Sequence, residues 1–237
     1  MRVRTNQSGR HATMCNMRSD LFSQAHHEIE TQDRFALQSK KMLKVTLGPA
    51  VLAAKGAMVA YQGPVQFHHK GAGSLGKFVK RAMTSEDTPL MEVSGQGEVF
   101  FADIAKNIFL LHLEGDGISV NGRSLLAFDG ALQWDVHRTK GAGVLTGGLF
   151  NTLIQGQGTV ALTSDGDPMI LDCSQLPTAV DPQAAVCWSA NLTPSIHNSM
   201  NAKSLVRGGS GEAIQYVFHG PGFVVVQPSE GPPIPTA

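Results

Sequence analysis

The 237-residue sequence has no excess of charge of either sign. Its 19 basic and 19 acidic side chains cancel, and charged residues make up only 16% of the chain. Proteins that bind nucleic acids usually carry a basic excess, because neutralised phosphates supply much of their affinity. The balance therefore argues against RNA as a partner unless a local basic patch exists. Since 42% of the residues are hydrophobic, the chain can still bury a core.

Long apolar runs are also missing. The nearest ones, Ala50–Ala54 and Phe109–Leu111, fall far short of the ~18 residues that a membrane-spanning helix needs. We therefore expect no membrane span. Residues 1–18 carry arginines but lack the apolar stretch of a secretory signal, so we expect a disordered tail, with a weak organelle-targeting peptide as the alternative. The true start is left open among Met1, Met14 and Met17.

Cysteine is scarce. Cys15, Cys173 and Cys187 include no CxxC pair, and their odd number argues against a disulfide framework. This favours the reducing cytoplasm as the compartment. Cys187 stands beside Trp188 in an apolar run, so we expect it to be a buried and inert thiol, and we expect the same of Cys173.

Catalytic and metal-binding motifs are absent as well. The sequence contains no GxSxG nucleophile turn, no HExxH and no His-x-His cluster. Its carboxylates tend to stand next to glycine or proline, as in Asp116-Gly117 and Asp129-Gly130, which is typical of turns. We therefore expect a protein that is not an enzyme and that holds no cofactor or metal.

One glycine-rich run resembles a phosphate loop. GAGSLGK at Gly71–Lys77 satisfies both GxxxxGK and GxGxxG, and it leads into the clearest helix candidate, Gly76–Met83. Position 78 is phenylalanine, however, which cannot ligate magnesium, and no alternating strand–helix pattern surrounds it. The pattern favours a flexible connection between strands. If an anion or a partner binds there, the binding residues are Lys77, Lys80 and Arg81.

Glycine, by contrast, is abundant, with 26 residues. From Lys41 onward, short runs rich in Val, Ile, Phe and Leu are broken every eight to twelve residues or so by Gly, Asp, Asn or Pro. Such spacing is typical of short strands joined by turns. The sequence therefore predicts an all-β protein with one short helix.

Three segments share a Gly-x-Gly-x-Val pattern. They are SGQGEVFFAD at 94–103, IQGQGTVALT at 154–163 and FHGPGFVVVQ at 218–227. Self-similarity at a fixed period indicates a repeat architecture. Glycine inside a strand marks a bulge or a close approach of another backbone, and we expect these glycines to have that structural role.

A second set of similar segments precedes the first. Val51–Gly63, Val120–Gly130 and Val180–Ala190 each begin like a strand, continue through a turn and end in a second apolar run with an aromatic residue. We interpret each as a β-hairpin. A unit of about 60 residues is too small to bury its own apolar face, so the units are expected to pack on one another in a pseudo-threefold arrangement.

The predicted organisation is a single domain over residues 19–228, followed by a Pro-rich tail at 229–237. Within the domain we expect three repeats, at about 42–110, 111–170 and 171–228. Trp134 and Trp188 follow or end the aromatic-terminated segments, so we expect them to anchor the packing of the units.

Several motifs occur together in a known family. The segments AAKGAMVAYQGPVQF, GQGEVFFAD, SLLAFDGALQW, VDPQAAVCWSANL and GPGFVVVQPSE resemble a bacterial-type member of the altered-inheritance-of-mitochondria family. The resemblance runs from about Met42 to Glu230. It implies a fold similar to that of the tryptophan RNA-binding attenuation protein (TRAP), with three TRAP-like β-sandwich or double-stranded β-helix modules. It also implies a homotrimer, no established enzymatic activity and a link to mitochondrial biogenesis.

Tryptophan and RNA binding do not follow from that likeness, because fold does not fix function and no ligand residue can be placed on this sequence. We expect a non-enzymatic, cytoplasmic scaffold or interaction protein with an unidentified protein partner. The alternative is a small-ligand or anion-binding protein with its site between β-modules.

Overall fold

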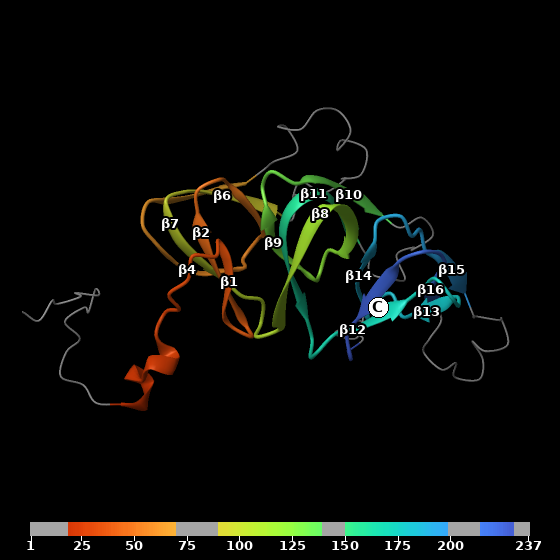
Figure 1. The fold of residues 1–237 in the computed structure, drawn as a ribbon, viewed down its shortest axis with the longest axis horizontal. Coiled ribbons are helices and arrows are strands. Elements are labelled where there is room, and N and C mark those ends of the chain that lie inside the picture. Colours follow the sequence, from red (N-terminus) through yellow and green to blue (C-terminus); the bar gives the residue numbers. More distant parts are fainter. Residues whose placement is uncertain (1–18, 70–89, 139–149, 199–213, 230–237) are drawn as a thin grey trace, which may run out of the picture. The chain divides into compact units, whose positions relative to one another are not determined.

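A computed structural model describes residues 19–69, 90–138, 150–198 and 214–229 (Figure 1). The chain forms two compact units, residues 1–32 and residues 33–237. The predicted tail at 1–18, the GAGSLGK run and the predicted helix Gly76–Met83 lie outside the described residues.

The described part of the first unit contains two short 3-10 helices, η1 (Asp20–Phe22) and η2 (Gln24–His26). The side chain of Ser19 caps η1 by accepting a hydrogen bond of 3.2 Å from the backbone N–H of Leu21. Such a cap satisfies one of the donors that the start of a helix leaves free. Neither helix buries a residue.

The second unit is built from strands, which confirms the predicted all-β class. In chain order these are β1 (Phe35–Ser39), β2 (Met42–Leu47), β3 (Val51–Ala54), β4 (Met58–Gln62), β5 (Val65–His69), β6 (Leu90–Gly95), β7 (Gly97–Phe101), β8 (Asn107–Asn121), β9 (Leu125–Asp129), β10 (Gln133–Arg138), β11 (Phe150–Ser164), β12 (Met169–Asp172), β13 (Thr178–Val180), β14 (Ala185–Ser189), β15 (Ser195–Asn198), β16 (Ile214–Phe218) and β17 (Phe223–Val226).

The described strands form three antiparallel sheets. A four-stranded sheet has the order β1-β2-β7-β4, and a three-stranded sheet has the order β13-β16-β15. Between them runs a ten-stranded sheet in the order β12-β17-β14-β8-β11-β9-β3-β6-β5, with β10 paired to β11. The two longest strands, β8 and β11, pair along almost their whole length and form the centre of this sheet.

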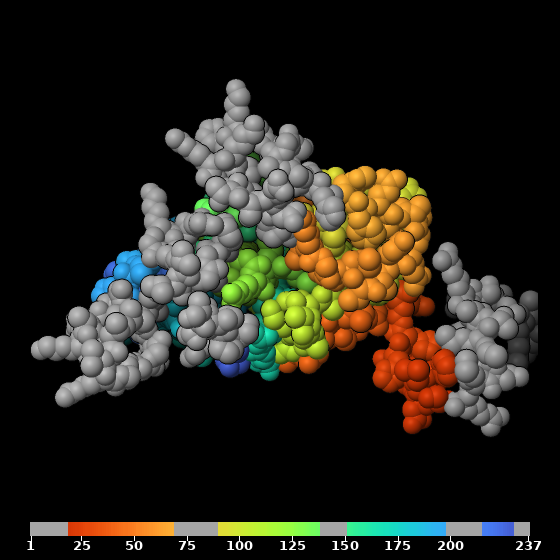
Figure 2. Space-filling model, turned by 180° about the vertical axis from the view of Figure 1, so that it is seen from behind, coloured from red at the N-terminus to blue at the C-terminus, as the bar shows by residue number. Residues whose placement is uncertain are grey.

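Three hydrophobic cores lie along the ten-stranded sheet. The first is centred on Val45, Val93 and Phe101, the second on Phe128, Ile154 and Leu162, and the third on Trp188, Tyr216 and Phe218. Figures 1 and 2 show the strands around the first core, in orange and yellow, and those around the third, in teal and blue, at opposite ends of the second unit.

The middle strands bury both of their faces. On β3, Val51 and Ala53 belong to the first core, while Leu52 between them belongs to the second. On β17, Val224 packs in the third core and Val225 in the second. Because neighbouring side chains on a strand point to opposite faces, one strand can separate two cores. This explains the continuous apolar runs in the sequence, since strands buried on both faces do not alternate.

The predicted hairpins are wrong, although their turns exist. Hydrogen bonds close the turns from Ala57 N to Ala54 O, from Ser124 N to Asn121 O and from Ala184 N to Asp181 O, at 3.2, 2.8 and 3.0 Å. The strands that flank each turn do not pair with each other. Strand β3 pairs with β6 and β9, whereas β4 pairs with β7.

The same separation occurs at the other two turns, where β11 lies between β8 and β9 and where β13 and β14 belong to different sheets. The residue types in a turn predict that the chain reverses its direction there. Which strands pair is decided instead by the burial of both strand faces.

The predicted role of the repeated glycines is confirmed in the first two segments. Gly97 has a φ of 122°, and a Cβ there would collide with the carbonyl oxygen of Gln62. At Gly156, with a φ of 120°, the pairing shifts so that Gly115 and Asp116 of β8 stand opposite this single residue of β11. This is a β-bulge, which bends the long β8–β11 ladder. That the three segments are copies of one TRAP-like unit stays a prediction, as do the proposed repeat limits.

Buried aromatic and sulfur groups occupy the third core. Trp188 is 2% exposed and makes an edge-on contact with Tyr216, with ring centroids 6.1 Å apart. Cys173 in the third core and Cys187 in the second are both buried free thiols, as expected. Trp134 is only partly buried, and it packs edge-on against Phe128 in the second core.

Candidate functional site

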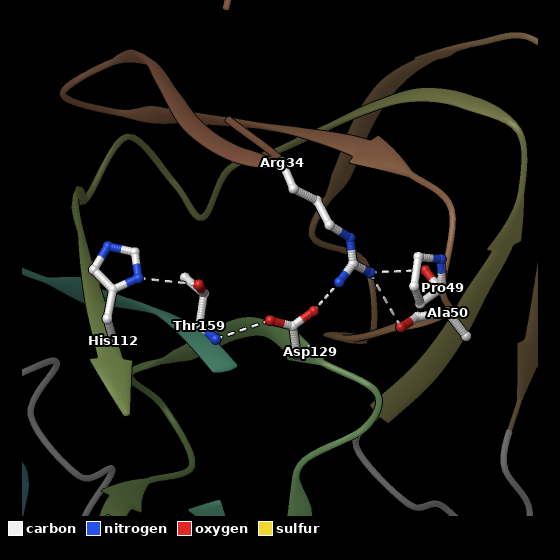
Figure 3. Close-up of polar contacts among 6 residues, drawn as sticks. All are labelled: Arg34, Pro49, Ala50, His112, Asp129 and Thr159. Carbon is white, nitrogen blue, oxygen red and sulfur yellow. Dashed lines mark hydrogen bonds and ion pairs between the residues drawn. The ribbon is translucent and has the colours of Figure 1, made fainter. Parts of the chain in front are cut away.

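A chain of polar contacts connects the first and second cores (Figure 3). Arg34, just before β1, forms an ion pair with the carboxylate of Asp129 at the end of β9. The same guanidinium donates hydrogen bonds to the carbonyl oxygens of Pro49 and Ala50, at 2.7 and 3.4 Å. One arginine thus connects three segments of the second unit: its own, the segment of Pro49 and Ala50, and the end of β9.

The Asp129 carboxylate extends the network in the other direction. Its Oδ2 accepts a hydrogen bond of 2.8 Å from the backbone N–H of Thr159 on β11. The hydroxyl of Thr159 then contacts Nδ1 of His112 on β8 at 3.1 Å. Figure 3 shows these groups in a row from Arg34 to His112. Because Asp129 receives both an arginine and a backbone donor, its negative charge is well compensated at this partly buried position.

Two glycines allow the segments of this network to approach each other. A Cβ on Gly130 would stand 2.6 Å from the carbonyl oxygen of Ala50, and the N–H of Gly130 donates to that oxygen at 3.0 Å. A Cβ on Gly158 would stand 3.0 Å from Oδ2 of Asp129. A larger residue at Gly130 would therefore collide with the Ala50 backbone, and one at Gly158 would crowd the Asp129 side chain.

A groove of about 630 Å³ lies at the bend of β8 and β11, beside the end of this network. His112 lines it, together with Asp116 and Gln155 from the two sides of the bulge. Ser189 and Asn191, at and after the end of β14, and Phe223 of β17 close it. The size is ordinary for a small-molecule site, and its lining mixes apolar walls with a few polar groups.

Most polar groups of the groove are held by hydrogen bonds within the protein. The Ser189 hydroxyl accepts from the N–H of Phe223 at 3.0 Å, and the amide of Asn191 donates to the carbonyl of Pro221 at 2.6 Å. The imidazole of His112 uses one ring nitrogen on Thr159, which leaves the other for a ligand. The groove can therefore offer His112 and the exposed Asp116 to a bound molecule.

Burial controls the chemistry of the thiol at Cys187. Desolvation raises its pKa from an ordinary value of 9.0 to about 12, so the group stays protonated at physiological pH. A protonated and buried thiol is a poor nucleophile and a poor metal ligand. Among the described residues, no group of three or more His, Cys, Asp or Glu side chains is arranged to hold a metal ion.

The predicted anion-binding residues Lys77, Lys80 and Arg81 lie outside the described residues. The Arg34–Asp129 network was not expected from the sequence. Asp129 was interpreted as a turn residue, and it does stand at a turn, where the N–H of Leu132 donates to its carbonyl at 3.1 Å. The role of Asp129 in the ion pair depends on Arg34, and nothing in the sequence connects two residues that lie so far apart in the chain.

No helix in the described part of the chain is long and apolar enough to cross a membrane.

Comparison with known proteins places this architecture in a family. A crystal structure of a protein from Streptococcus pyogenes matches with a TM-score of 0.67 and 24% sequence identity, covering 82% of this chain and 92% of that chain. At this identity the likeness shows the fold alone. No curated protein matches the chain. The model of the family described as mitochondrial biogenesis AIM24 matches residues 35–229, which include every described strand. The resemblance that the sequence motifs predicted is thereby confirmed, and the chain belongs to the mitochondrial biogenesis AIM24 family.

Proposed function

We propose that this protein is a non-enzymatic, homotrimeric scaffold whose chains pair through exposed apolar edge strands. The proposal rests on two edge strands, each of which pairs with one neighbour only among the described strands. Strand β4 ends the four-stranded sheet and pairs only with β7 among the described strands, and strand β12 ends the ten-stranded sheet and pairs only with β17.

Both edges expose apolar side chains, although β4 has a register shift at Val59 and β12 carries the exposed Asp172. On β4, Val59 is 51% and Tyr61 50% exposed, and the strand carries no charged residue. On β12, Met169 is 56% and Ile170 70% exposed. Proteins usually defend such edges with lysine, proline or bulges, because an open edge can pair with another chain. Coverage by a second copy explains their exposure in a single chain.

The two edges belong to opposite ends of the second unit, one beside the first core and one beside the third. A contact between unlike edges of two copies is heterologous, and such contacts close into a ring when the rotation permits. A ring of three copies fits the predicted trimer. Sequence features support the remaining parts of the proposal: the lack of catalytic motifs supports a non-enzymatic role, and the lack of a disulfide framework supports the cytoplasm.

The family's description ties its members to mitochondrial biogenesis. A scaffold that presents several copies of one surface to an unidentified protein partner is compatible with such a link, since repeated surfaces gain affinity by multivalent binding.

Native mass spectrometry of the freshly purified protein tests the assembly. We expect a trimer for the natural chain and monomers for the variants Tyr61→Glu and Ile170→Glu, because a carboxylate at either edge cannot be buried in an apolar contact. Leu176→Glu is the matched control, since Leu176 is 72% exposed but lies in a loop. A natural chain that stays monomeric at micromolar concentration, or edge variants that remain trimeric, would contradict the proposal.

The groove beside His112 supports a second function, the binding of a small ligand between β-modules. Its walls come from β8, β11, the end of β14 and Phe223 of β17, so that side chains from four strands of the ten-stranded sheet surround it. The same spectrum tests this function, because a retained ligand adds a stoichiometric mass to the protein, whereas the bare protein mass in every freshly purified preparation would count against it.

A further inference from the structure

A second cavity, of about 460 Å³, opens where several segments of the second unit meet. One is the turn from Asp103 to Lys106 between β7 and β8, and another is the turn from Asn121 to Ser124 between β8 and β9. Gln183 and Gln227 from the third-core side complete the wall. The cavity is separate from the groove beside His112, with which it shares no lining residue.

The amide side chains of its wall are committed to hydrogen bonds inside the protein. Asn121 is 3% exposed, donates to the carbonyls of Pro182 and Ala185 at 3.3 and 3.1 Å, and accepts from the N–H of Arg123 at 3.1 Å. The amide of Gln227 accepts from the N–H of Asp165 at 2.9 Å. Its nitrogen donates to the carbonyls of Gln183 and Ser229 at 3.3 and 3.1 Å. These bonds fix the wall in one arrangement.

One charged pair in the lining is already neutralised. Lys106 forms an ion pair of 2.8 Å with Asp103 across the turn, and its ammonium also donates to the carbonyl of Arg123 at 3.3 Å. Both partners therefore act as part of the wall, and they leave no net charge in the cavity.

Two further charges of opposite sign, on Arg123 and Asp165, have no ion-pair partner among the described residues. Within the same residues, the guanidinium of Arg123 makes one hydrogen bond, of 3.3 Å, to the neutral amide oxygen of Gln183. The carboxylate of Asp165 has no partner among the described residues, and it forms no ion pair with Arg123 although both residues line the same cavity. By contrast, the guanidinium of Arg34 is paired with the carboxylate of Asp129. The cavity thus presents the exposed cation of Arg123 and the half-buried anion of Asp165 at separate points, each without an ion-pair partner among the described residues.

The rim of the cavity is strained. Ile104 and Ala105 have φ values of 42° and 56°, in the left-handed region that costs an L-residue about 1–2 kcal/mol each. A hydrogen bond of 2.8 Å from the N–H of Lys106 to the carbonyl of Asp103 holds the turn in this shape. The turn leaves the Ile104 side chain 93% exposed at the cavity. Backbone strain of this kind is concentrated at ligand clamps and similar sites.

We propose that this cavity binds a small zwitterion, with the anionic group of the ligand on Arg123 and its ammonium group on Asp165. A ligand with a single charge would form an ion pair with only one of these two residues. The other residue would then have no charged partner in the bound ligand. Arginine suits a carboxylate or phosphate because its planar fork donates two parallel hydrogen bonds. Ile104 then offers an apolar contact to the remainder of the ligand. The volume is within the range of small-molecule sites.

This site is independent of the proposed trimer, since none of its residues belongs to β4 or β12. The zwitterion could be a free amino acid or the phosphoethanolamine headgroup of a lipid, and both share the chemistry of one anion and one ammonium group.

Isothermal titration calorimetry with the full chain tests the site. The free zwitterions are glycine, β-alanine and γ-aminobutyrate, whose charged groups are progressively further apart, and leucine, which adds an apolar branch. O-phosphoethanolamine and vesicles containing phosphatidylethanolamine test the lipid source. Acetate and ethylammonium are the singly charged comparators.

We expect at least one zwitterion to bind at least tenfold more tightly than either singly charged comparator. Both Arg123→Gln and Asp165→Asn should weaken that binding by about tenfold or more, which is the loss of one hydrogen-bonded charge. Lys41→Gln is the matched control, because Lys41 is exposed and lies outside the cavity, and it should leave binding unchanged. Far-UV circular dichroism and the Tm of each variant establish that it is folded.

Binding to free amino acids but not to phosphoethanolamine or vesicles assigns the site to a metabolite, and the reverse assigns it to a headgroup. Either result supports the proposal. It is overturned if no zwitterion binds, if acetate binds as tightly as the zwitterions, or if folded Asp165→Asn binds as tightly as the natural chain.

Discussion

Arg34 and Asp129 lie 95 positions apart in the chain and are joined by an ion pair. The side chain of Arg34 is 29% and that of Asp129 15% exposed, so the pair is shielded from much of the solvent. The Arg34 guanidinium also lies 5.3 Å from the centre of the Phe35 ring, a cation–π distance. The pair therefore connects the start of β1 to the end of β9 and holds the first core against the second.

Loss of either member of this pair should destabilise the protein. We expect Asp129→Asn to lower the free energy of unfolding by about 1–3 kcal/mol, because a partly buried guanidinium would lose its charged partner and the Thr159 N–H would lose a carboxylate acceptor. Urea unfolding of the single variants and of the double variant with Arg34→Gln measures the loss and the coupling energy.

The matched control is the exposed pair formed by Lys40 and Asp167, whose side chains are 60% and 75% exposed. Lys40→Gln should change the free energy of unfolding much less than Asp129→Asn does, since exposed ion pairs contribute little. Equal losses at the two pairs would show that burial does not strengthen the Arg34–Asp129 contact.

Substitution of Gly97 tests the first Gly-x-Gly segment. We expect Gly97→Ala to destabilise the protein by several kcal/mol, about 2 or more, because its φ of 122° disfavours any side chain and the new Cβ would collide with the Gln62 carbonyl oxygen. Gly48→Ala is the control, since a Cβ there meets nothing within 4 Å. Thermal unfolding followed by circular dichroism compares them. A Gly97→Ala protein with the Tm of the natural chain would contradict the close approach of β4 and β7.

The buried thiol of Cys187 should make stability fall at alkaline pH. Its pKa is about 12 in the folded protein and 9.0 when unperturbed, so above pH 9 the unfolded chain loses this proton while the folded chain keeps it. The folded state then binds more protons, and the free energy of unfolding decreases as the pH rises from 9 towards 12. Between pH 8 and pH 10 the expected loss is about 1 kcal/mol.

Urea unfolding at pH 8 and pH 10 measures this effect, with Cys187→Ala as the reference because it lacks the thiol. The natural chain should lose more stability between the two pH values than the variant does. Identical losses would mean that Cys187 is not desolvated in the folded protein. A native thiol that reacts readily with iodoacetamide at pH 8 would lead to the same conclusion, once the reacting residue is identified by peptide mass spectrometry.

The sequence predicted the structure best where the signal is local. Short apolar runs separated by turn residues gave the all-β class, and the apolar run around Cys187 and Trp188 correctly indicated burial. The turn at Lys55-Gly56 was also correct, since it is set by residues that are adjacent in the chain. The strands on either side of it were assigned to the wrong partners, because pairing depends on which faces are buried and not on the turn alone.

The candidate sites were less visible from the sequence. Familiar motif spacings in the sequence indicated Lys77, Lys80 and Arg81 in and after a glycine-rich run. Arg123 stands in a turn that the sequence indicated only as a hairpin connection, and Asp165 stands next to Gly166, in the pattern that is typical of turns. No spacing rule connects the two, because they are brought to one cavity by the path of β8, β9 and β11 through the ten-stranded sheet.

By itself, the sequence determined the strand-rich class, the positions of the turns, the glycine positions where backbones approach and the family to which the chain belongs. These properties depend on side-chain size, conformational preference and motif order, which are local features of the sequence. Only the tertiary structure decided that one sheet separates three cores, that Arg34 reaches Asp129, and that Arg123 and Asp165 share a cavity without pairing. The physical reason is that burial of both faces of the central strands selects partners from distant segments, and the charges then lie wherever that packing places them.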